Sequence, residues 1–140
     1  MSDERKQSGE TNGIGVGERG STHGFVQSFG YAFHGIAHAF SSQFNFRVQV
    51  CIALVAIVLG FALRIDQPDW LAIIICIGLV LGGECVNTAL EAAVDLASPE
   101  YHDLARHAKD CAAGAVLVAS FASLAIACLI FLPRLYHLFL

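Results

Sequence analysis

The hydrophobic residues of the chain gather into long runs, and three of these runs contain no charged side chain. They cover residues 48–63, 70–83 and 111–133. The third run is ~34 Å long as a helix and exceeds the ~30 Å hydrocarbon core of a bilayer. The first reaches only ~24 Å, but the long side chains of Arg47 and Arg64 can extend to the interface at its two ends. We therefore predict membrane spans at 47–64 and 110–133.

The second run is only ~21 Å long as a helix, so it must continue through Glu84 to cross the membrane. Four polar residues follow at helical spacing: Glu84, Asn87, Glu91 and Asp95. At ~100° per residue they fall within an arc of ~80° on one helix face. Pro99 disfavours the helical conformation of the residue before it and should end the helix. The pattern predicts a span at 70–97, which is the second of three along the chain.

Residues 25–46 carry no formal charge but show a clear helical stripe of large apolar side chains. The stripe consists of Phe25, Phe29, Phe33, Ile36, Phe40 and Phe44, with polar residues opposite. This pattern is typical of an amphipathic helix that lies on the membrane surface. A fourth helix packed on the bundle is the alternative, and the two are compatible. Residues 1–24 are rich in Ser, Gly, Glu and Lys, which predicts a mobile tail before a membrane domain at 25–140.

Composition supports a membrane protein and excludes several other classes. The 140 residues are 56% hydrophobic and only 14% charged, whereas soluble domains average ~25% charged residues. The length excludes an eight-stranded βα barrel and a two-domain kinase. The net charge of −4 provides no basic face, so nucleic acid is not an expected partner. The predicted fold class is an all-α membrane protein.

The distribution of Lys and Arg predicts the orientation. If the amino terminus is cytoplasmic, six basic residues lie inside and only Arg64 and Arg134 lie outside. The positive-inside rule favours this arrangement. The loop after the second span, which we expect at 98–110, and the polar end of that span then face the cytoplasm.

Two carboxylates in a membrane helix are costly and require a function or a partner. From the helical rise, Glu84 lies ~9 Å inside the hydrocarbon edge, whereas Glu91 lies ~10.5 Å further on, near the headgroups. A poorly hydrated Glu84 can act as a general base, and a hydrated Glu91 suits a hard cation such as Mg²⁺. Alternatively, both acids are satisfied by each other, by Asn87 or by water within the bundle. Lys109 can pair with phosphate or can be a simple positive-inside anchor.

Several motifs resemble those of the small prokaryotic integral-membrane diacylglycerol kinases and undecaprenol kinases. The motifs are the runs 83–96 (GECVNTALEAAVDL), 98–102 (SPEYH), 108–110 (AKD) and 112–116 (AAGAV), together with 30–35 (GYAFHG) and 45–47 (NFR). The resemblance extends from about Ser28 to Leu135. The E-x-x-N-[ST]-A-x-E-x-x-x-D pattern with A-K-D at the expected distance is specific.

This resemblance implies a homotrimer of three-span protomers with a surface helix, in the inner (cytoplasmic) membrane, with composite active sites at its cytoplasmic side. Mg²⁺-ATP would donate its γ-phosphoryl group to a lipid alcohol. By position in the motifs, Glu84 matches the general base and Glu91 a metal ligand, while Asn87 and Asp95 match supporting residues. The matches to nucleotide contacts are Tyr31, Glu100, Tyr101, His102, Lys109 and Asp110.

One position departs from the family pattern. The second metal-binding carboxylate would fall where this chain has Gln43. A glutamine carbonyl can coordinate Mg²⁺, but the site loses one negative charge and should bind the metal less tightly. Either Gln43 binds the nucleotide-bound metal through its oxygen, or another acid replaces it, or activity is weakened.

We therefore expect a lipid kinase. Residues 131–135 (FLPRL) and 45–47 resemble the undecaprenol kinase branch, which slightly favours undecaprenol over diacylglycerol as the substrate. The rival from another class is a small oligomeric channel or cation carrier lined by Glu84, Glu91 and Asp95.

Overall fold

The computed structural model describes residues 22–139, which form four helices and no strand. The helices are α1 (Thr22–Ser42), α2 (Phe44–Ala62), α3 (Gln67–Ala97) and α4 (Asp103–Phe139). Most of the predicted tail, residues 1–21, lies outside the described residues. Helices α2, α3 and α4 are each long and apolar enough to cross a membrane. The predicted all-helical class with three spans is confirmed.

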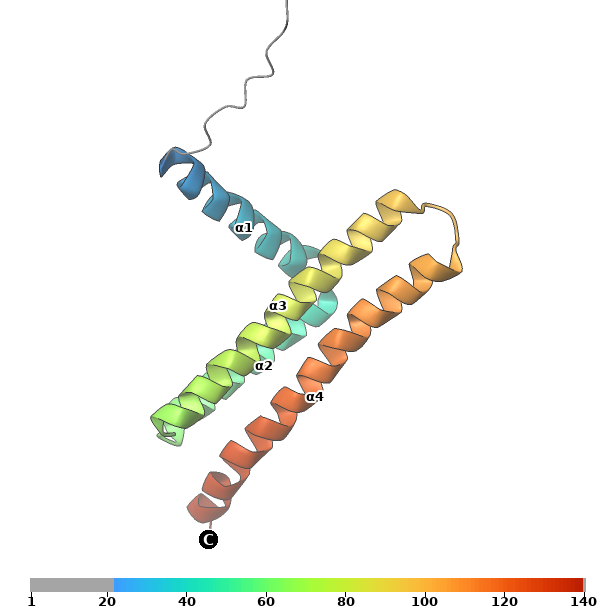
Figure 1. Ribbon diagram of the computed structural model, residues 1–140. Helices are drawn as coiled ribbons and strands as arrows, with labels where there is room; N and C mark the ends of the chain where they lie inside the picture. The colour runs from blue at the N-terminus through green and yellow to red at the C-terminus, as the bar shows by residue number, and fades with distance from the viewer. Residues whose placement is uncertain (1–21, 140) are drawn as a thin grey trace, which may run out of the picture.

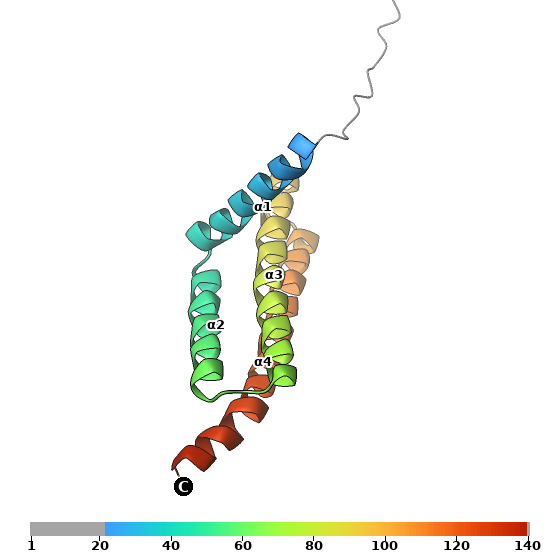
Figure 2. The same cartoon turned by 90° about the vertical axis from the view of Figure 1, so that its left-hand side faces the viewer.

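The long helices α3 and α4 run antiparallel and side by side, and α2 packs mainly against α3 (Figures 1 and 2). Helix α1 lies at an angle to α2 and approaches the carboxyl-terminal half of α3. The side chains of Phe33 and Ile36 on α1 are exposed, as are many apolar residues of the three spans. Exposed apolar surface of this extent is expected where lipid or another subunit covers a membrane protein.

The boundary between α1 and α2 differs from the prediction of one helix at 25–46. Gln43 is extended, with φ −103° and ψ 118°, so Phe44 begins α2 and is not part of the α1 stripe. The break lets Phe46 fold back against Phe40, with the two rings edge to face at 6.4 Å. Phe46 and Ala39 are thereby buried at the corner. Burial of an aromatic ring provides the physical reason for the turn.

Both ends of α4 extend beyond the predicted span of 110–133. The helix already begins at Asp103, so the predicted loop at 98–110 is too long by about two helical turns. His102 contributes to this start, because its Nδ1 accepts a hydrogen bond from the backbone N–H of Leu104 at 3.2 Å. At the other end the helix continues through Pro133. Arg134 Nη1 donates to the carbonyl of Ile130 at 2.8 Å, which holds the arginine side chain against the helix just after the proline.

The turn between α2 and α3 anchors one end of the bundle. Arg64 adopts φ 50°, and the N–H of Ile65 donates to the carbonyl of Gly60 at 3.1 Å, as in a Schellman cap. Ile65 then joins Ile73, Ile130 and Phe131 in a buried cluster. Arg134 of α4 pairs with Asp69 and, at 3.4 Å, with Asp66. These contacts fix the end of the bundle that lies far from α1.

Gly60 is required for the close approach of α2 to Trp70. A Cβ atom at this position would lie 2.8 Å from Trp70 Cη2 and 3.1 Å from Ile65 Cδ1. We expect Gly60→Ala to lower the free energy of unfolding by ~1–2 kcal/mol, because the overpacked ring must shift. Thermal unfolding in detergent micelles measures the effect.

Gly78→Ala is the matched control for this prediction. Gly78 lies on α3, and an added Cβ would meet no atom within 4 Å. Both changes improve helix propensity by the same amount, so only the contact with Trp70 differs. Equal midpoints of unfolding for the two variants would contradict the prediction.

Candidate active site

A pocket of about 320 Å³ lies between the start of α2, the middle of α3 and α4. We call it the polar pocket, because polar side chains contribute much of its wall. It is lined by Gln43, Asn45, Val48, Gln49, Glu84, Asn87, Glu91, Ala113, Val116, Leu117 and Ser120. The pocket therefore brings together three of the residues predicted on one face of α3 and the predicted metal ligand Gln43.

The carboxylates of α3 are enclosed to different degrees. Glu84 is only 3% exposed and Asn87 only 6%, whereas Glu91 is half-buried. Thr88 is buried beside them, and its hydroxyl donates to the backbone carbonyl of Glu84 at 2.9 Å. The two acids therefore differ in burial, with Glu84 enclosed by protein and Glu91 partly exposed.

Two amide side chains donate to the carboxylate of Glu91. Gln43 Nε2 donates to Oε2 at 3.2 Å, and Asn87 Nδ2 donates to Oε1 at 3.0 Å. Gln43 reaches this position because it is the extended residue between α1 and α2. The corner of the chain thus places an amide opposite an acid that lies 48 positions later.

Glu84 has a different partner, which the sequence analysis missed. Gln49 Nε2, from the second turn of α2, donates to Glu84 Oε2 at 3.3 Å. The only signal in the sequence was a single uncharged polar residue inside an apolar run. Such a residue is easily taken for a tolerated substitution, because nothing in its spacing connects it to a helix 35 residues away.

The donor set of the pocket fits a hard divalent cation. Its candidate ligands are all oxygens: the Glu91 carboxylate and the side-chain carbonyls of Gln43 and Asn87. Asn87 Oδ1 is buried and accepts no hydrogen bond from any of the described residues. An unpartnered buried oxygen next to a carboxylate is a suitable ligand for Mg²⁺. The described part of the chain holds no cluster of three or more His, Cys, Asp or Glu side chains.

Lys109 and Asp95 lie outside the polar pocket and form an ion pair with each other. This pair joins the last turns of α3 to the first turns of α4. Both side chains are substantially exposed, at 36% for Lys109 and 65% for Asp95. An exposed pair of this kind is weak and can exchange partners readily.

The remaining predicted nucleotide contacts are exposed and also lie outside the pocket. Glu100, Tyr101 and His102 form the turn between α3 and α4, Asp110 lies on α4, and Tyr31 lies on α1. The Tyr101 hydroxyl donates to Asp103 Oδ1 at 2.9 Å. This hydrogen bond raises the pKa of Tyr101, and desolvation and the charge of Asp110 add to the rise. Tyr101 therefore remains a hydrogen-bond donor at neutral pH.

The fold and the site define a helical membrane protein with an acidic, amide-lined pocket among its three spans. A family model described as prokaryotic diacylglycerol kinase matches residues 30–131. An undecaprenol kinase of Bacillus subtilis is 38% identical over 117 residues, which cover 84% of this chain and 95% of the relative. The chain belongs to the prokaryotic diacylglycerol kinase family and is a lipid kinase, a transferase.

Two further relatives carry a different substrate in their names. A diacylglycerol kinase of Synechocystis is 40% identical over 114 residues, covering 79% of this chain and 64% of the relative. The diacylglycerol kinase of Escherichia coli K12 is 34% identical over 102 residues, covering 71% and 84%. These relatives support the predicted enzyme class and do not favour the channel or cation carrier.

Proposed function

We propose that the chain transfers the γ-phosphoryl group of Mg²⁺-ATP to the hydroxyl group of a membrane lipid alcohol, at the polar pocket. The observation that carries this proposal is the enclosure of Glu84 in the same pocket as Glu91 and its amide partners. A shielded carboxylate for the hydroxyl and an oxygen-rich site for the metal are the two elements that phosphoryl transfer to an alcohol requires.

In this proposal Glu84 is the general base. Its carboxylate accepts the proton of the lipid hydroxyl as the hydroxyl oxygen attacks the γ-phosphorus. A new O–P bond forms, the bond to the bridging oxygen of ADP breaks, and ADP leaves. Burial favours this role, because a base that is poorly solvated need not first shed its hydration shell. The hydrogen bond from Gln49 fixes the orientation of the carboxylate.

Glu91, Gln43 and Asn87 would hold the metal ion. For this purpose the two amides must rotate, because both now direct their N–H groups at Glu91. Mg²⁺ would supply charge neutralisation and orientation for the phosphate oxygens. The neutral Gln43 leaves one carboxylate, Glu91, to provide the formal negative charge among these three ligands.

Lys109 would exchange Asp95 for a phosphate oxygen, with Asp95 holding the lysine in place until the nucleotide arrives. Tyr31, Glu100, Tyr101, His102 and Asp110 would contact the nucleotide from the turn after α3, from α4 and from α1. Their exposure is compatible with access from water.

Undecaprenol is the slightly favoured acceptor over diacylglycerol. The residues at 131–135 and 45–47 resemble the undecaprenol branch, and the undecaprenol kinase of Bacillus subtilis aligns along nearly its whole length. Contacts to hydrocarbon chains discriminate weakly, which is why the preference is small.

The proposed setting is the inner membrane of a prokaryotic cell, with the amino terminus and the pocket on the cytoplasmic side. Six of the eight Lys and Arg residues lie on that side in this orientation. Helix α1 would rest in the interface on its phenylalanine stripe, and three protomers would form a homotrimer that covers exposed apolar surface of the spans.

Phosphoryl transfer in mixed micelles tests the proposal. Purified protein is incubated with labelled ATP and Mg²⁺, with undecaprenol and diacylglycerol supplied separately. We expect label in the lipid phase, with a higher kcat/KM for undecaprenol. Protein that is folded and trimeric but transfers label to neither lipid would overturn the proposal, and a higher value for diacylglycerol would reverse the substrate preference.

A further inference from the structure

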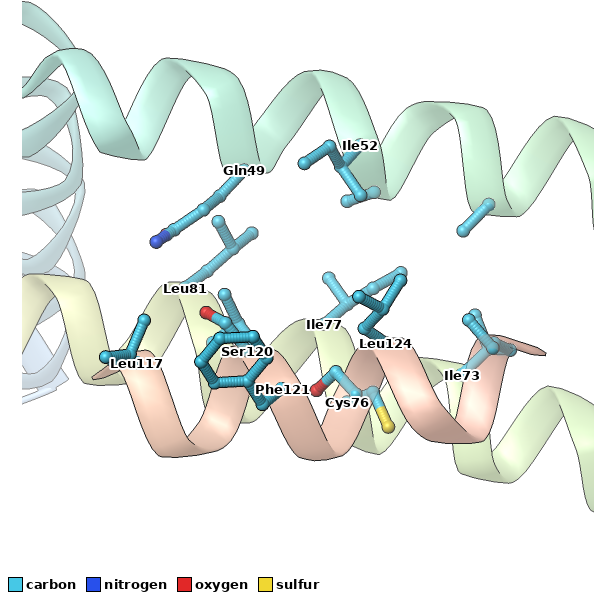
Figure 3. Close-up of a pocket in the computed structure, with 15 residues that line it drawn as sticks. Gln49, Ile52, Ile73, Cys76, Ile77, Leu81, Leu117, Ser120, Phe121 and Leu124 are labelled. Carbon is cyan, nitrogen blue, oxygen red and sulfur yellow. The ribbon is translucent and has the colours of Figure 1, made fainter. Parts of the chain in front are cut away.

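A second, apolar cavity of about 280 Å³ lies deeper among the spans, between α2, α3 and α4. Its wall is almost entirely hydrocarbon, with Ile52 from α2, Ile73 and Ile77 from α3, and Phe121 and Leu124 from α4 (Figure 3). We call it the apolar cavity. A cavity with this lining is suited to a hydrocarbon chain and unsuited to a nucleotide.

The apolar cavity and the polar pocket meet at three shared residues. Gln49, Leu117 and Ser120 line both of them. Figure 3 shows Gln49 extending from α2 toward the helices that carry Leu81, Leu117 and Ser120. A ligand with an apolar chain in one compartment and a polar head in the other must therefore pass Gln49.

The amide of Gln49 uses only one of its two polar ends. Its Nε2 donates to Glu84, whereas its Oε1 is buried and accepts no hydrogen bond within the described part of the chain. A buried acceptor without a donor is unfavourable and rare in native proteins. The missing partner must carry a hydrogen-bond donor and reach a position where hydrocarbon begins. The hydroxyl group of a long-chain lipid alcohol has both properties.

We propose that Gln49 positions the lipid acceptor as well as the base. Its Oε1 accepts a hydrogen bond from the hydroxyl of a lipid alcohol whose chain occupies the apolar cavity, while its Nε2 holds Glu84 Oε2. The hydroxyl proton then passes to Glu84, the hydroxyl oxygen bonds to the γ-phosphorus, and ADP departs with the bridging oxygen. This inference rests on the proposed function and assigns one further residue to it.

Two variants separate the two hydrogen bonds of Gln49. Gln49→Leu removes both, so we expect the KM for the lipid alcohol to rise about tenfold and kcat to fall about tenfold. Gln49→Glu keeps acceptor oxygens but loses the N–H donor to Glu84. For this variant we expect the lipid KM to stay within about threefold of wild type while kcat falls about tenfold. The KM for ATP should change less than about twofold in both, because neither hydrogen bond involves the nucleotide.

Lipid binding without nucleotide provides a readout that is independent of turnover. Native mass spectrometry of the protein titrated with undecaprenol, and separately with diacylglycerol, should show weaker binding to Gln49→Leu and nearly unchanged binding to Gln49→Glu. Gln67→Leu makes the same change at an exposed position at the amino-terminal end of α3, away from Glu84 and Glu91. This variant should leave binding and kinetics unaltered.

The outcomes distinguish this inference from the proposed function. Folded Gln49→Leu protein with wild-type lipid binding and lipid KM overturns the role of Gln49 alone. If Gln49→Leu weakens lipid binding but the wild-type protein transfers no phosphate, the proposed function alone is overturned. Equal loss of lipid binding in Gln49→Leu and Gln49→Glu would overturn the assignment of Oε1 as the acceptor.

Discussion

Replacing Glu84 by Gln is expected to lower kcat by a factor of about 10²–10⁴, the range typical for loss of a general base. The substitution preserves the size of the side chain and its capacity to accept a hydrogen bond from Gln49 Nε2. It removes the charge and the basicity. Because Glu84 is almost fully buried, the neutral amide should also fold at least as well as the carboxylate.

The measurement is single-turnover transfer of labelled phosphate from ATP, together with nucleotide binding by equilibrium dialysis. Nucleotide affinity should change little, because Glu91 and Lys109 remain in place. Asp66→Asn is a useful comparison, because Asp66 is an exposed carboxylate just before α3, 18 residues from Glu84 and outside the polar pocket. We expect it to retain kcat within about threefold, as is usual for surface positions. Normal turnover by Glu84→Gln would show that another group accepts the proton.

Replacing Gln43 by Glu is expected to lower the Mg²⁺ concentration for half-maximal rate by about tenfold, since a second carboxylate joins Glu91. The two side chains already lie within hydrogen-bond distance, at 3.2 Å. Without metal the variant loses that hydrogen bond and gains a repulsion between like charges. Mg²⁺ should therefore raise its melting temperature more than it raises that of the wild type.

Gln67→Glu is the matched control for this change. It adds the same charge at an exposed position at the far end of α3 and should leave both the Mg²⁺ requirement and the response of the melting temperature unchanged. An unaltered requirement in Gln43→Glu would show that this position does not contact the metal. A similar shift in Gln67→Glu would indicate a general effect of net charge.

The hydrophobic pattern predicted the spans well because lipid imposes a simple condition on each helix. The end of α3 before Pro99 and the shared face of Glu84, Asn87 and Glu91 follow from helical geometry alone. The ends of α4 were less predictable. Charged residues limit the part of a helix that can lie in lipid, but the helix itself can continue into water. Helix α4 therefore runs from Asp103 to Phe139, past both ends of the predicted span at 110–133.

The site was predictable only where its residues share a helix or a known motif. Gln43 came from the resemblance, and its contact with Glu91 depends on the corner at which Phe46 packs against Phe40. Gln49 was missed because its role depends on the distance between α2 and α3, which no periodicity within either helix reports. Packing between helices decides such contacts, and a single sequence contains little information about it.

The polar face of α3, formed by Glu84, Asn87, Glu91 and Asp95, has a further consequence for the phosphate donor. By helical rise, Asp95 lies ~16 Å along the axis from Glu84, and Lys109 is paired at that far end. A donor that meets both ends within one protomer must be elongated and must lie along the helix, with its reactive end where hydration is poorest. Compact donors such as pyrophosphate or acetyl phosphate are shorter than this ~16 Å separation and could not contact both ends. Under the proposed function, this separation would favour an elongated donor such as a nucleotide over a compact one.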